Sequence, residues 1–296
     1  MKILDGLKIQ NEMIEELRDY FSNKRVEISI IQLGNLPESN AYVRQKKIIG
    51  EKIGVGVSVI KLDEDITNDE LKLFIRTLNK SEKYQGIMVQ EPLPAHIDTS
   101  VLDIISPTKD IDCQTTVSKG YLFNSKSYNS FEPCTPKGII LTLDKYNIDI
   151  AGKDVLVIGR SDIVGRPMAE MFTQRNATVT LAHSQTANIK EKLSNYDIIV
   201  VAVGKKEFIT NEDIATMKDG VILIDVGIHR DEVDGKAIFS GDIVKNITED
   251  NKEKISYITP VPGGVGRTTV VGLFLNLKFA IESRISNDFG YTCKYR

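Results

Sequence analysis

A tyrosine and a lysine near the N-terminus have types and spacing suited to chemistry. Tyr42 and Lys46 stand four residues apart in a segment of helical periodicity, 38–53, so both side chains lie on one face of the expected helix. Ser39 precedes Tyr42 by three residues on the same segment. A lysine amine is an acid when charged and a base when neutral, and burial favours the neutral form. A solvated Tyr/Lys pair on an exposed helix face is the simple alternative.

Three further segments carry polar or flexible residues where ligands commonly bind. The apolar run 86–90 ends in Gln90, at the C-terminal end of an expected strand, where open α/β sheets bind ligands. Asp110 and Asp112 form a short acidic segment after Pro107. The loop 259–266 is dense in proline and glycine, which allows a ligand to approach the backbone closely. A strand cap, an acidic turn and a rigid connector are the plain alternatives.

A strand, a glycine turn and a helix follow one another around Gly159, in the order that places a phosphate at a helix N-terminus. Only Gly159 and Gly165 are present, six residues apart, so the segment does not match G-x-G-x-x-G. The next strand ends in His183 and Ser184, without the acid that usually binds the ribose 2′-hydroxyl. A hydroxyl and the nearby Arg160 suit a 2′-phosphate, which favours NADP over NAD. The alternatives are a solvated arginine and a helix-capping serine.

Strand-like and helical segments alternate along most of the chain, which predicts an α/β fold with parallel strands. A first block has helices at 5–23, 38–53 and 67–81 and strands at 26–33, 55–62 and 86–90. A second block has strands at 154–158, 178–182, 198–203, 221–226 and about 255–259, with helices between the first four. The segment 106–137, with three prolines and a polar stretch at 124–130, breaks the pattern as a candidate domain boundary.

The expected architecture has two α/β domains flanking a cleft, the second a Rossmann-like NAD(P)-binding domain with a mainly parallel sheet. The apolar helix at 268–284 is expected to pack back on the first block. We therefore assign 1–120 plus about 270–296 to the first domain, and 121–269 to the second, NADP-binding domain. The tail after 286 is expected to be loose.

Composition excludes several classes of protein. The 296 residues carry a net charge of −3, from 38 basic and 41 acidic side chains, so no nucleic-acid partner is expected. Three cysteines without zinc spacing, and three histidines far apart in sequence, predict neither disulfides nor a metal site. The charged N-terminus lacks the apolar region of a signal peptide, and no apolar run is long enough to span a membrane. A cytoplasmic protein is expected.

Seven segments together resemble one family, the methylenetetrahydrofolate dehydrogenase/cyclohydrolases, across nearly the whole chain. In order, they are Ser39…Tyr42-Val-Arg-Gln-Lys46, Gly86-Ile-Met-Val-Gln90-x-Pro92-Leu-Pro94, Lys109-Asp-Ile-Asp112, Pro133-Cys-Thr-Pro136, Gly159-Arg-Ser-x-x-Val-Gly165-x-Pro167, Asp225-Val-Gly227 and Thr259-Pro-Val-Pro-Gly-Gly-Val-Gly266. Each motif is weak by itself, but seven in the right order make a chance match very improbable.

The resemblance implies a bifunctional enzyme of one-carbon metabolism. Methylenetetrahydrofolate gives a hydride to NADP⁺, with NAD as a second option, and water then converts the methenyl product to 10-formyltetrahydrofolate. By similarity, Lys46 is the key catalytic residue and Gln90 hydrogen-bonds to it. Tyr42 stacks on the folate, and Asp112 accepts hydrogen bonds from the pterin. The loop residues Pro262, Gly263 and Gly264 line the folate cleft.

The cofactor contacts implied by the resemblance and the glycine turn form one set: Gly159, Arg160, Ser161, Gly165, Ser184, Gly204, Gly227, Ile228 and Thr269. The resemblance also implies a homodimer and a place in purine biosynthesis. No metal is expected.

The chain departs from the family pattern at four positions near the expected site. The family usually has Leu where this chain has Glu91, Gly where it has Cys113, and Pro-Met where it has Arg267 and Thr268. A monofunctional dehydrogenase with a weakened cyclohydrolase step is therefore one alternative. A non-catalytic folate- or nucleotide-binding protein is another, although a binder has no need of the Lys46 amine.

Overall fold

The computed structural model describes residues 1–124, 130–233 and 236–286. Most of the polar stretch predicted at 124–130, the tail after 286 and Cys293 lie outside the described residues. The chain divides into two compact units. One contains Met1–Gln10 and Thr135–Thr269, and the other contains Asn11–Cys134 with the described residues from Val270 on.

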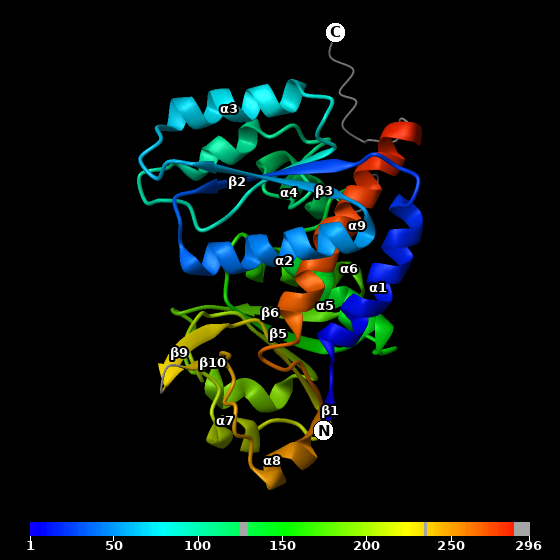
Figure 1. The fold of residues 1–296 in the computed structure, drawn as a ribbon. Helices are drawn as coiled ribbons and strands as arrows, with labels where there is room; N and C mark the ends of the chain where they lie inside the picture. Colours follow the sequence, from blue (N-terminus) through cyan, green and yellow to red (C-terminus); the bar gives the residue numbers. More distant parts are fainter. Residues whose placement is uncertain (125–129, 234–235, 287–296) are drawn as a thin grey trace. The chain divides into compact units, whose positions relative to one another are not determined.

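The unit around Asn11–Cys134 is built on a three-stranded parallel sheet of order β3-β2-β4. Its elements are α1 (Gly6–Phe21), β2 (Glu27–Leu33), α2 (Pro37–Ile53), β3 (Gly56–Leu62), α3 (Asn68–Lys80), β4 (Gly86–Val89), the 3₁₀ helix η1 (Thr99–Ile104) and α4 (Thr116–Phe123). α1 begins in the other unit, as does α9 (Val265–Ser286). Helices α2 and α3 lie on opposite sides of the strands (Figure 1).

Alternation along β4 sends its side chains to these two sides. Ile87 and Val89 join a buried cluster with Leu71 and Ile75 of α3. Met88 therefore points to the opposite side, where α2 lies, and Gln90 follows it at the same spacing. Alternation along the strand therefore places the side chains of Met88 and Gln90 on the side that faces α2.

The other unit is built on a six-stranded sheet of order β1-β11-β8-β7-β5-β6, in which every pairing is parallel. Its elements are β1 (Lys2–Ile3), α5 (Cys134–Lys145), β5 (Asp154–Ile158), α6 (Gly165–Gln174), β6 (Thr178–Ala182), η2 (Lys190–Asn195), β7 (Ile198–Val201), α7 (Asn211–Ala215), β8 (Val221–Asp225), β9 (His229–Val233), β10 (Lys236–Ser240), α8 (Glu249–Lys254) and β11 (Ile255–Ile258). The central strands are continuous apolar runs because both faces of a parallel sheet are covered. The predicted α/β class and mainly parallel second sheet are confirmed.

Several short elements differ from the sequence prediction. The helix predicted between β6 and β7 is a short 3₁₀ helix, η2. Asn188 has a left-handed backbone (φ 53°) just before this element, and η2 itself is only six residues long. The antiparallel pair β9–β10 and the strand β1 were not predicted, because β1 has only two residues and β9 lacks the apolar run that marks the buried strands. The segment 106–137, predicted only as a break, contains α4 and the start of α5.

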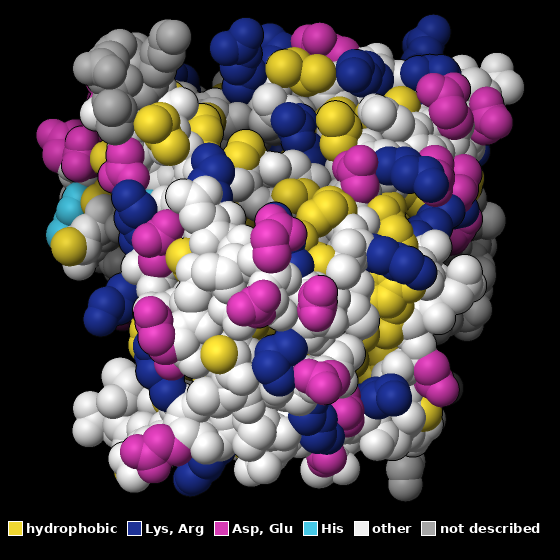
Figure 2. Space-filling view, turned by 90° about the horizontal axis from the view of Figure 1, so that it is seen from below, with side chains coloured by type: hydrophobic (Ala, Val, Ile, Leu, Met, Phe, Trp, Pro, Cys, Tyr) yellow, Lys and Arg dark blue, Asp and Glu magenta, His cyan; other side chains and the backbone are white. Residues whose placement is uncertain are grey.

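Among the described residues, no helix is long and apolar enough to cross a membrane. Figure 2 shows basic and acidic side chains intermixed over the face that it presents. The charges on that face therefore largely offset one another.

Candidate active site

Lys46 is buried beneath α2, with only 7% of its surface exposed. Its Nζ donates a hydrogen bond to Gln90 Oε1 at 2.9 Å, and lies 3.4 Å from Met88 Sδ. Gly50, one turn further along α2, allows this burial, because a Cβ there would lie 2.4 Å from Val57 Cγ2 of β3. The close approach of helix to strand brings the amine against the side chains that β4 sends to this side.

Burial lowers the pKa of the Lys46 amine, while the carboxylate of Asp112, the thiol of Cys134 and the carboxylate of Glu91 act in the opposite direction. The neutral amine is therefore more accessible than it is in a surface lysine. Gln90 Oε1 is the hydrogen-bond acceptor that stabilises and orients the charged form. A lysine held in this way is suited to exchange a proton with a bound water.

The end of β4 is fixed by a second amide, Gln114. Its side chain pairs with the backbone of Val89 in both directions: Nε2 donates to the Val89 carbonyl at 2.8 Å, and Oε1 accepts from the Val89 N–H at 2.9 Å. The same Nε2 lies 3.4 Å from Glu91 Oε2. Gln90 Nε2 in turn donates to the Glu91 carbonyl at 2.7 Å. Both amides therefore hold the strand end in one conformation. Gln114 was not predicted from sequence, because its role depends on a contact 25 residues away.

The carboxyl group of Glu91 is part of the same surroundings. Burial, followed by the charge of Asp112, raises the pKa of Glu91. Gln114, Lys119 and Lys46 oppose this rise. The departure at position 91 therefore places an ionisable group, in place of an apolar one, within electrostatic range of the Lys46 amine.

The two aspartates of the acidic segment have different surroundings. Asp110 is fully buried, and its two carboxylate oxygens accept the backbone N–H groups of Gln114 and Thr115 at 2.8 and 2.9 Å. It therefore shapes the turn that leads into α4. Asp112 is only half-buried, and its charge acts on both Lys46 and Glu91. Asp112 is thus the member of the pair that remains free to meet a ligand.

Cys113 adopts a left-handed backbone with φ 55°, a conformation that favours glycine. This agrees with the glycine that the family resemblance leads one to expect there. Its side chain is buried, and its Sγ lies 3.4 Å from the Phe131 carbonyl. The thiol therefore has a structural contact, and burial raises its pKa well above the usual value.

Tyr42 is half-buried on α2, one turn before Lys46, and burial raises the pKa of its phenol. Ser39 is buried at the start of the same helix. α2 begins with Pro37 in its first turn and ends at Gly54 in the left-handed conformation, which are common start and stop signals. The helix thereby places Tyr42 and Lys46 on adjacent turns of one face, as their spacing predicts.

In the unit with the six-stranded sheet, two glycines form a tight turn between β5 and α6. A Cβ at Gly159 would lie 2.2 Å from the Ala202 carbonyl oxygen, and one at Gly165 would lie 1.9 Å from the Gly159 carbonyl oxygen. Gly159 also has a φ of 125°. Ser161 Oγ accepts the Val164 N–H at 3.2 Å at the start of the helix. Both glycines are therefore required by close packing at a helix N-terminus, where phosphates bind.

The other predicted cofactor residues follow the C-terminal ends of the parallel strands. Ile158 of β5 is in register with Ala182 of β6, so Arg160 and Ser184, both exposed, stand two residues beyond this pair at one edge of the sheet. Gly204 follows β7, and Gly227 and Ile228 follow β8. The loop that contains Pro262, Gly263 and Gly264 follows β11, and Thr269 lies in the first turns of α9. No acidic residue follows β6 at His183–Ser184.

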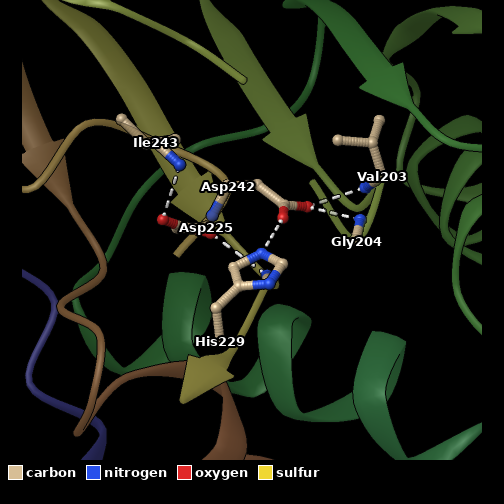
Figure 3. A network of polar contacts seen from close by, with 7 residues as sticks. Val203, Gly204, Asp225, His229, Asp242 and Ile243 are labelled. Carbon is tan, nitrogen blue, oxygen red and sulfur yellow. Dashed lines mark hydrogen bonds and ion pairs between the residues drawn. The ribbon is translucent and has the colours of Figure 1, made fainter. Parts of the chain in front are cut away.

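A carboxylate network that the sequence did not reveal lies at the same edge (Figure 3). Asp225 ends β8, and burial raises its pKa to about 6 although its carboxylate accepts backbone N–H groups. Asp242 and His229 complete the network, with His229 Nε2 2.8 Å from Asp242 Oδ1. Within the described ranges, no group of three or more His, Cys, Asp or Glu side chains is arranged to hold a metal ion.

Two family models match the chain. The model described as "Tetrahydrofolate dehydrogenase/cyclohydrolase, catalytic domain" matches residues 4–112. The model described as "Tetrahydrofolate dehydrogenase/cyclohydrolase, NAD(P)-binding domain" matches residues 133–285. The chain belongs to the tetrahydrofolate dehydrogenase/cyclohydrolase family.

Relatives in this family are similar over almost their whole length. A bifunctional protein FolD of Clostridium perfringens is 42% identical over 282 residues, covering 93% of this chain and 98% of the relative. The FolD of Bacillus subtilis is 40% identical over 280 residues, covering 93% and 95%.

Solved structures of the family show the same fold. The bifunctional FolD of Campylobacter jejuni has a TM-score of 0.87 at 38% identity, covering 96% of this chain and 99% of that one. The Trypanosoma brucei enzyme, solved with NADP and an inhibitor, has a TM-score of 0.87 at 31% identity, covering 96% and 98%. The predicted family is therefore confirmed.

Proposed function

We propose that this chain oxidises 5,10-methylenetetrahydrofolate to 5,10-methenyltetrahydrofolate with NADP⁺ and then hydrolyses that product to 10-formyltetrahydrofolate. The family and its FolD relatives, which are named as bifunctional, support both activities. The observation that carries the proposal is the buried Lys46 amine hydrogen-bonded to Gln90. A protein that only bound folate would not need to bury a lysine, because removing a charge from water is costly.

The residues present fit a dinucleotide phosphate. The glycines at 159 and 165 allow the chain to turn tightly between β5 and the N-terminus of α6, because a Cβ at either position would collide with neighbouring backbone, and a helix N-terminus after such a turn suits a phosphate. Arg160 and Ser184 stand at one sheet edge without a competing carboxylate at the end of β6, which suits the 2′-phosphate of NADP. NADP⁺ supplies the hydride acceptor. The protein's own task in that step is to hold the two reacting rings together and exclude water.

In the hydrolytic step, we propose that neutral Lys46 accepts a proton from the attacking water. The water oxygen bonds to the methenyl carbon and gives a neutral carbinolamine. The carbinol hydroxyl then loses its proton, N5 takes up a proton as its bond to the carbon breaks, and a formyl group remains on N10. Gln90 stabilises the ammonium that Lys46 becomes, because its Oε1 already accepts from Nζ. The lowered pKa of Lys46 makes the neutral form available before the step.

The remaining site residues are proposed contacts. Asp112 is half-buried and within electrostatic range of Lys46, and it would accept hydrogen bonds from the N–H groups of the pterin. Tyr42 would stack on the folate. Pro262, Gly263 and Gly264 would line the folate site. Gly204, Gly227, Ile228, Ser161 and Thr269 would contact the dinucleotide. We propose the domain assignment of 1–120 plus about 270–296 to folate and 121–269 to NADP.

One assay separates the proposed function from its alternatives. Purified protein is mixed with methylenetetrahydrofolate and NADP⁺, and NADPH and methenyltetrahydrofolate are followed by their absorbance, with NAD⁺ in a parallel reaction. A rise in NADPH with methenyl at its chemical background supports the bifunctional enzyme. Accumulating methenyl identifies a dehydrogenase with a weakened second step, for which Glu91 beside Lys46 is the structural candidate. Absence of both signals, with NADP⁺ or folate still bound, identifies a binding protein.

We propose a cytoplasmic location and a homodimer. Cys113 and Cys134 are buried and are not joined in a disulfide, which agrees with a reducing compartment. The pair β9–β10 forms its own two-stranded sheet and exposes Ile238, a surface suited to a second copy. Light scattering of the purified protein tests the dimer, and localisation of a tagged chain tests the compartment. The formyl product would serve purine biosynthesis. Growth without added purines, in a strain depleted of this protein, tests this role.

A further inference from the structure

Asp242 connects two loops that carry proposed cofactor contacts. Its Oδ2 accepts the backbone N–H groups of Val203 and Gly204, at 2.7 and 2.9 Å, in the turn after β7. Its Oδ1 lies 2.8 Å from Nε2 of His229, at the start of β9. Figure 3 shows the carboxylate between these two partners. One fully buried side chain therefore holds the exits of two adjacent parallel strands, β7 and β8.

A second carboxylate fixes Asp242 itself. Asp225, the last residue of β8, accepts the Asp242 N–H at 2.9 Å through Oδ1 and the Ile243 N–H at 3.0 Å through Oδ2. Asp225 Oδ1 also accepts the Gly227 N–H at 3.1 Å, in the loop after the same strand. The position of the Asp242 backbone is thus set by the sheet, and the position of the two loops is set by Asp242.

Two glycines leave room for these carboxylates. A Cβ at Gly227 would lie 2.2 Å from Asp242 Oδ1, and a Cβ at Gly241 would lie 1.9 Å from Asp225 Oδ2. Gly227, proposed above as a cofactor contact, therefore also serves to admit Asp242. Buried charges are costly unless they are fully hydrogen-bonded, so an arrangement of two adjacent buried carboxylates requires the donors that these loops supply.

We infer that Asp242 is a positioning residue for the dinucleotide: it holds the Gly204 turn and the Gly227–His229 segment in the conformation that binds the cofactor. The inference rests on the proposed function, because it takes these loops as part of the NADP site. Asp242 acts through the backbone of its neighbours and does not itself exchange a proton or contact the reacting atoms. Asp242 holds the Gly227–His229 segment through the His229 ring, so removing the ring nitrogens would release that segment and leave the Gly204 turn held.

The test compares three variants by equilibrium binding of NADP⁺, measured by calorimetry, and by cyclohydrolase rate on methenyltetrahydrofolate without cofactor. Asp242→Ala removes three hydrogen bonds and is expected to weaken NADP⁺ binding at least about tenfold, with the cyclohydrolase rate within about twofold of wild type. Asp242→Asn is expected to restore binding to within about threefold, since its oxygen still accepts both N–H groups and its amide can donate to the facing ring nitrogen of His229. Asp213→Ala is the control, because Asp213 accepts a backbone N–H at the start of α7 and pairs with Lys190 in the same unit.

Each outcome decides the inference. Weakened binding in Asp242→Ala, recovery in Asp242→Asn and no change in Asp213→Ala support it. Unchanged binding in Asp242→Ala, or an equal loss in the Asp213 control, would overturn it. If the wild-type protein does not bind NADP⁺ at all, the proposed function fails, and this result is distinct from failure of the positioning role. Thermal melting of each variant identifies any that does not fold. If Asp242→Ala does not fold, His229→Phe replaces it, because this variant removes only the ring donor. His229→Phe is expected to weaken NADP⁺ binding about threefold, and unchanged binding would overturn the inference.

Discussion

Lys46 and Gln90, 44 residues apart in sequence, are joined by a 2.9 Å hydrogen bond in which the lysine amine donates to the amide oxygen. The bond lies in buried surroundings, where burial lowers the pKa of the amine and nearby Asp112 opposes the shift. The pair therefore combines an accessible neutral form with an acceptor for the charged form. Both are needed by a group that takes up a proton and later releases it.

Replacing Lys46 tests this role directly. Lys46→Met keeps a chain of similar length, and is expected to lower the cyclohydrolase rate by at least about 10²-fold, in line with the loss of a general base. NADP⁺ binding, measured by calorimetry, should stay unchanged. Lys47→Met is the matched control, because Lys47 is exposed on the next position of α2. Full cyclohydrolase activity in Lys46→Met would remove the amine from the mechanism.

Glu91 should set the pH dependence of the same step. Its carboxylate raises the pKa of Lys46, so Glu91→Gln is expected to lower that pKa further. The neutral amine then predominates from a lower pH, and the rising limb of the cyclohydrolase pH–rate profile should move toward acid. The profile is measured from initial rates after subtracting the uncatalysed hydrolysis. Asp65→Asn is the control, because Asp65 is an exposed carboxylate of the same unit, and it should not shift the profile. An unshifted profile in Glu91→Gln would show that Glu91 does not affect the pKa of Lys46.

Arg160 should distinguish the two dinucleotides. Arg160→Ala removes the cation proposed to bind the 2′-phosphate, and is expected to weaken NADP⁺ binding about tenfold while changing NAD⁺ binding by less than about twofold. Titrations of both cofactors give the comparison. Arg166→Ala is the control, since Arg166 is exposed on α6 and pairs with Asp162 at 2.7 Å. An equal effect on NADP⁺ and NAD⁺ would contradict the 2′-phosphate role.

The glycine turn can be tested through stability. Gly165→Ala places a Cβ 1.9 Å from the Gly159 carbonyl oxygen, and the forced backbone shift is expected to cost about 1–3 kcal/mol of unfolding free energy or more. NADP⁺ binding should weaken with it. Gly266→Ala, where a Cβ meets nothing nearby, should be neutral or stabilise helix α9 by up to about 1 kcal/mol. Denaturant unfolding measures both; equal stability of the two variants would show that the turn can relax.

Much of the fold follows from local patterns. The apolar runs 154–158 and 198–201 are strands because only a sheet covered on both faces buries such runs completely. The helix predicted at 67–81 is present as α3, which a capping box of Thr67 and Glu70 starts. Glycines at positions 159 and 165 were recognised because a tight turn constrains the residue type locally. Patterns of this kind act within a few residues, so the sequence alone determines them.

The properties of the site depended on the tertiary structure. Spacing placed Tyr42 and Lys46 on one face, but the burial of Lys46 depends on the close approach of α2 to β3 at Gly50. The sequence treated Asp110 and Asp112 alike, whereas packing buries the first against Gln114 and leaves the second half-exposed.

Asp242 carried no local signal, because its partners at positions 203, 204 and 229 come from separate loops. Hydrogen bonds and pKa shifts depend on distances and burial that only the folded chain sets, so the sequence determined the family and the frame, and the tertiary structure decided which side chains are placed to act.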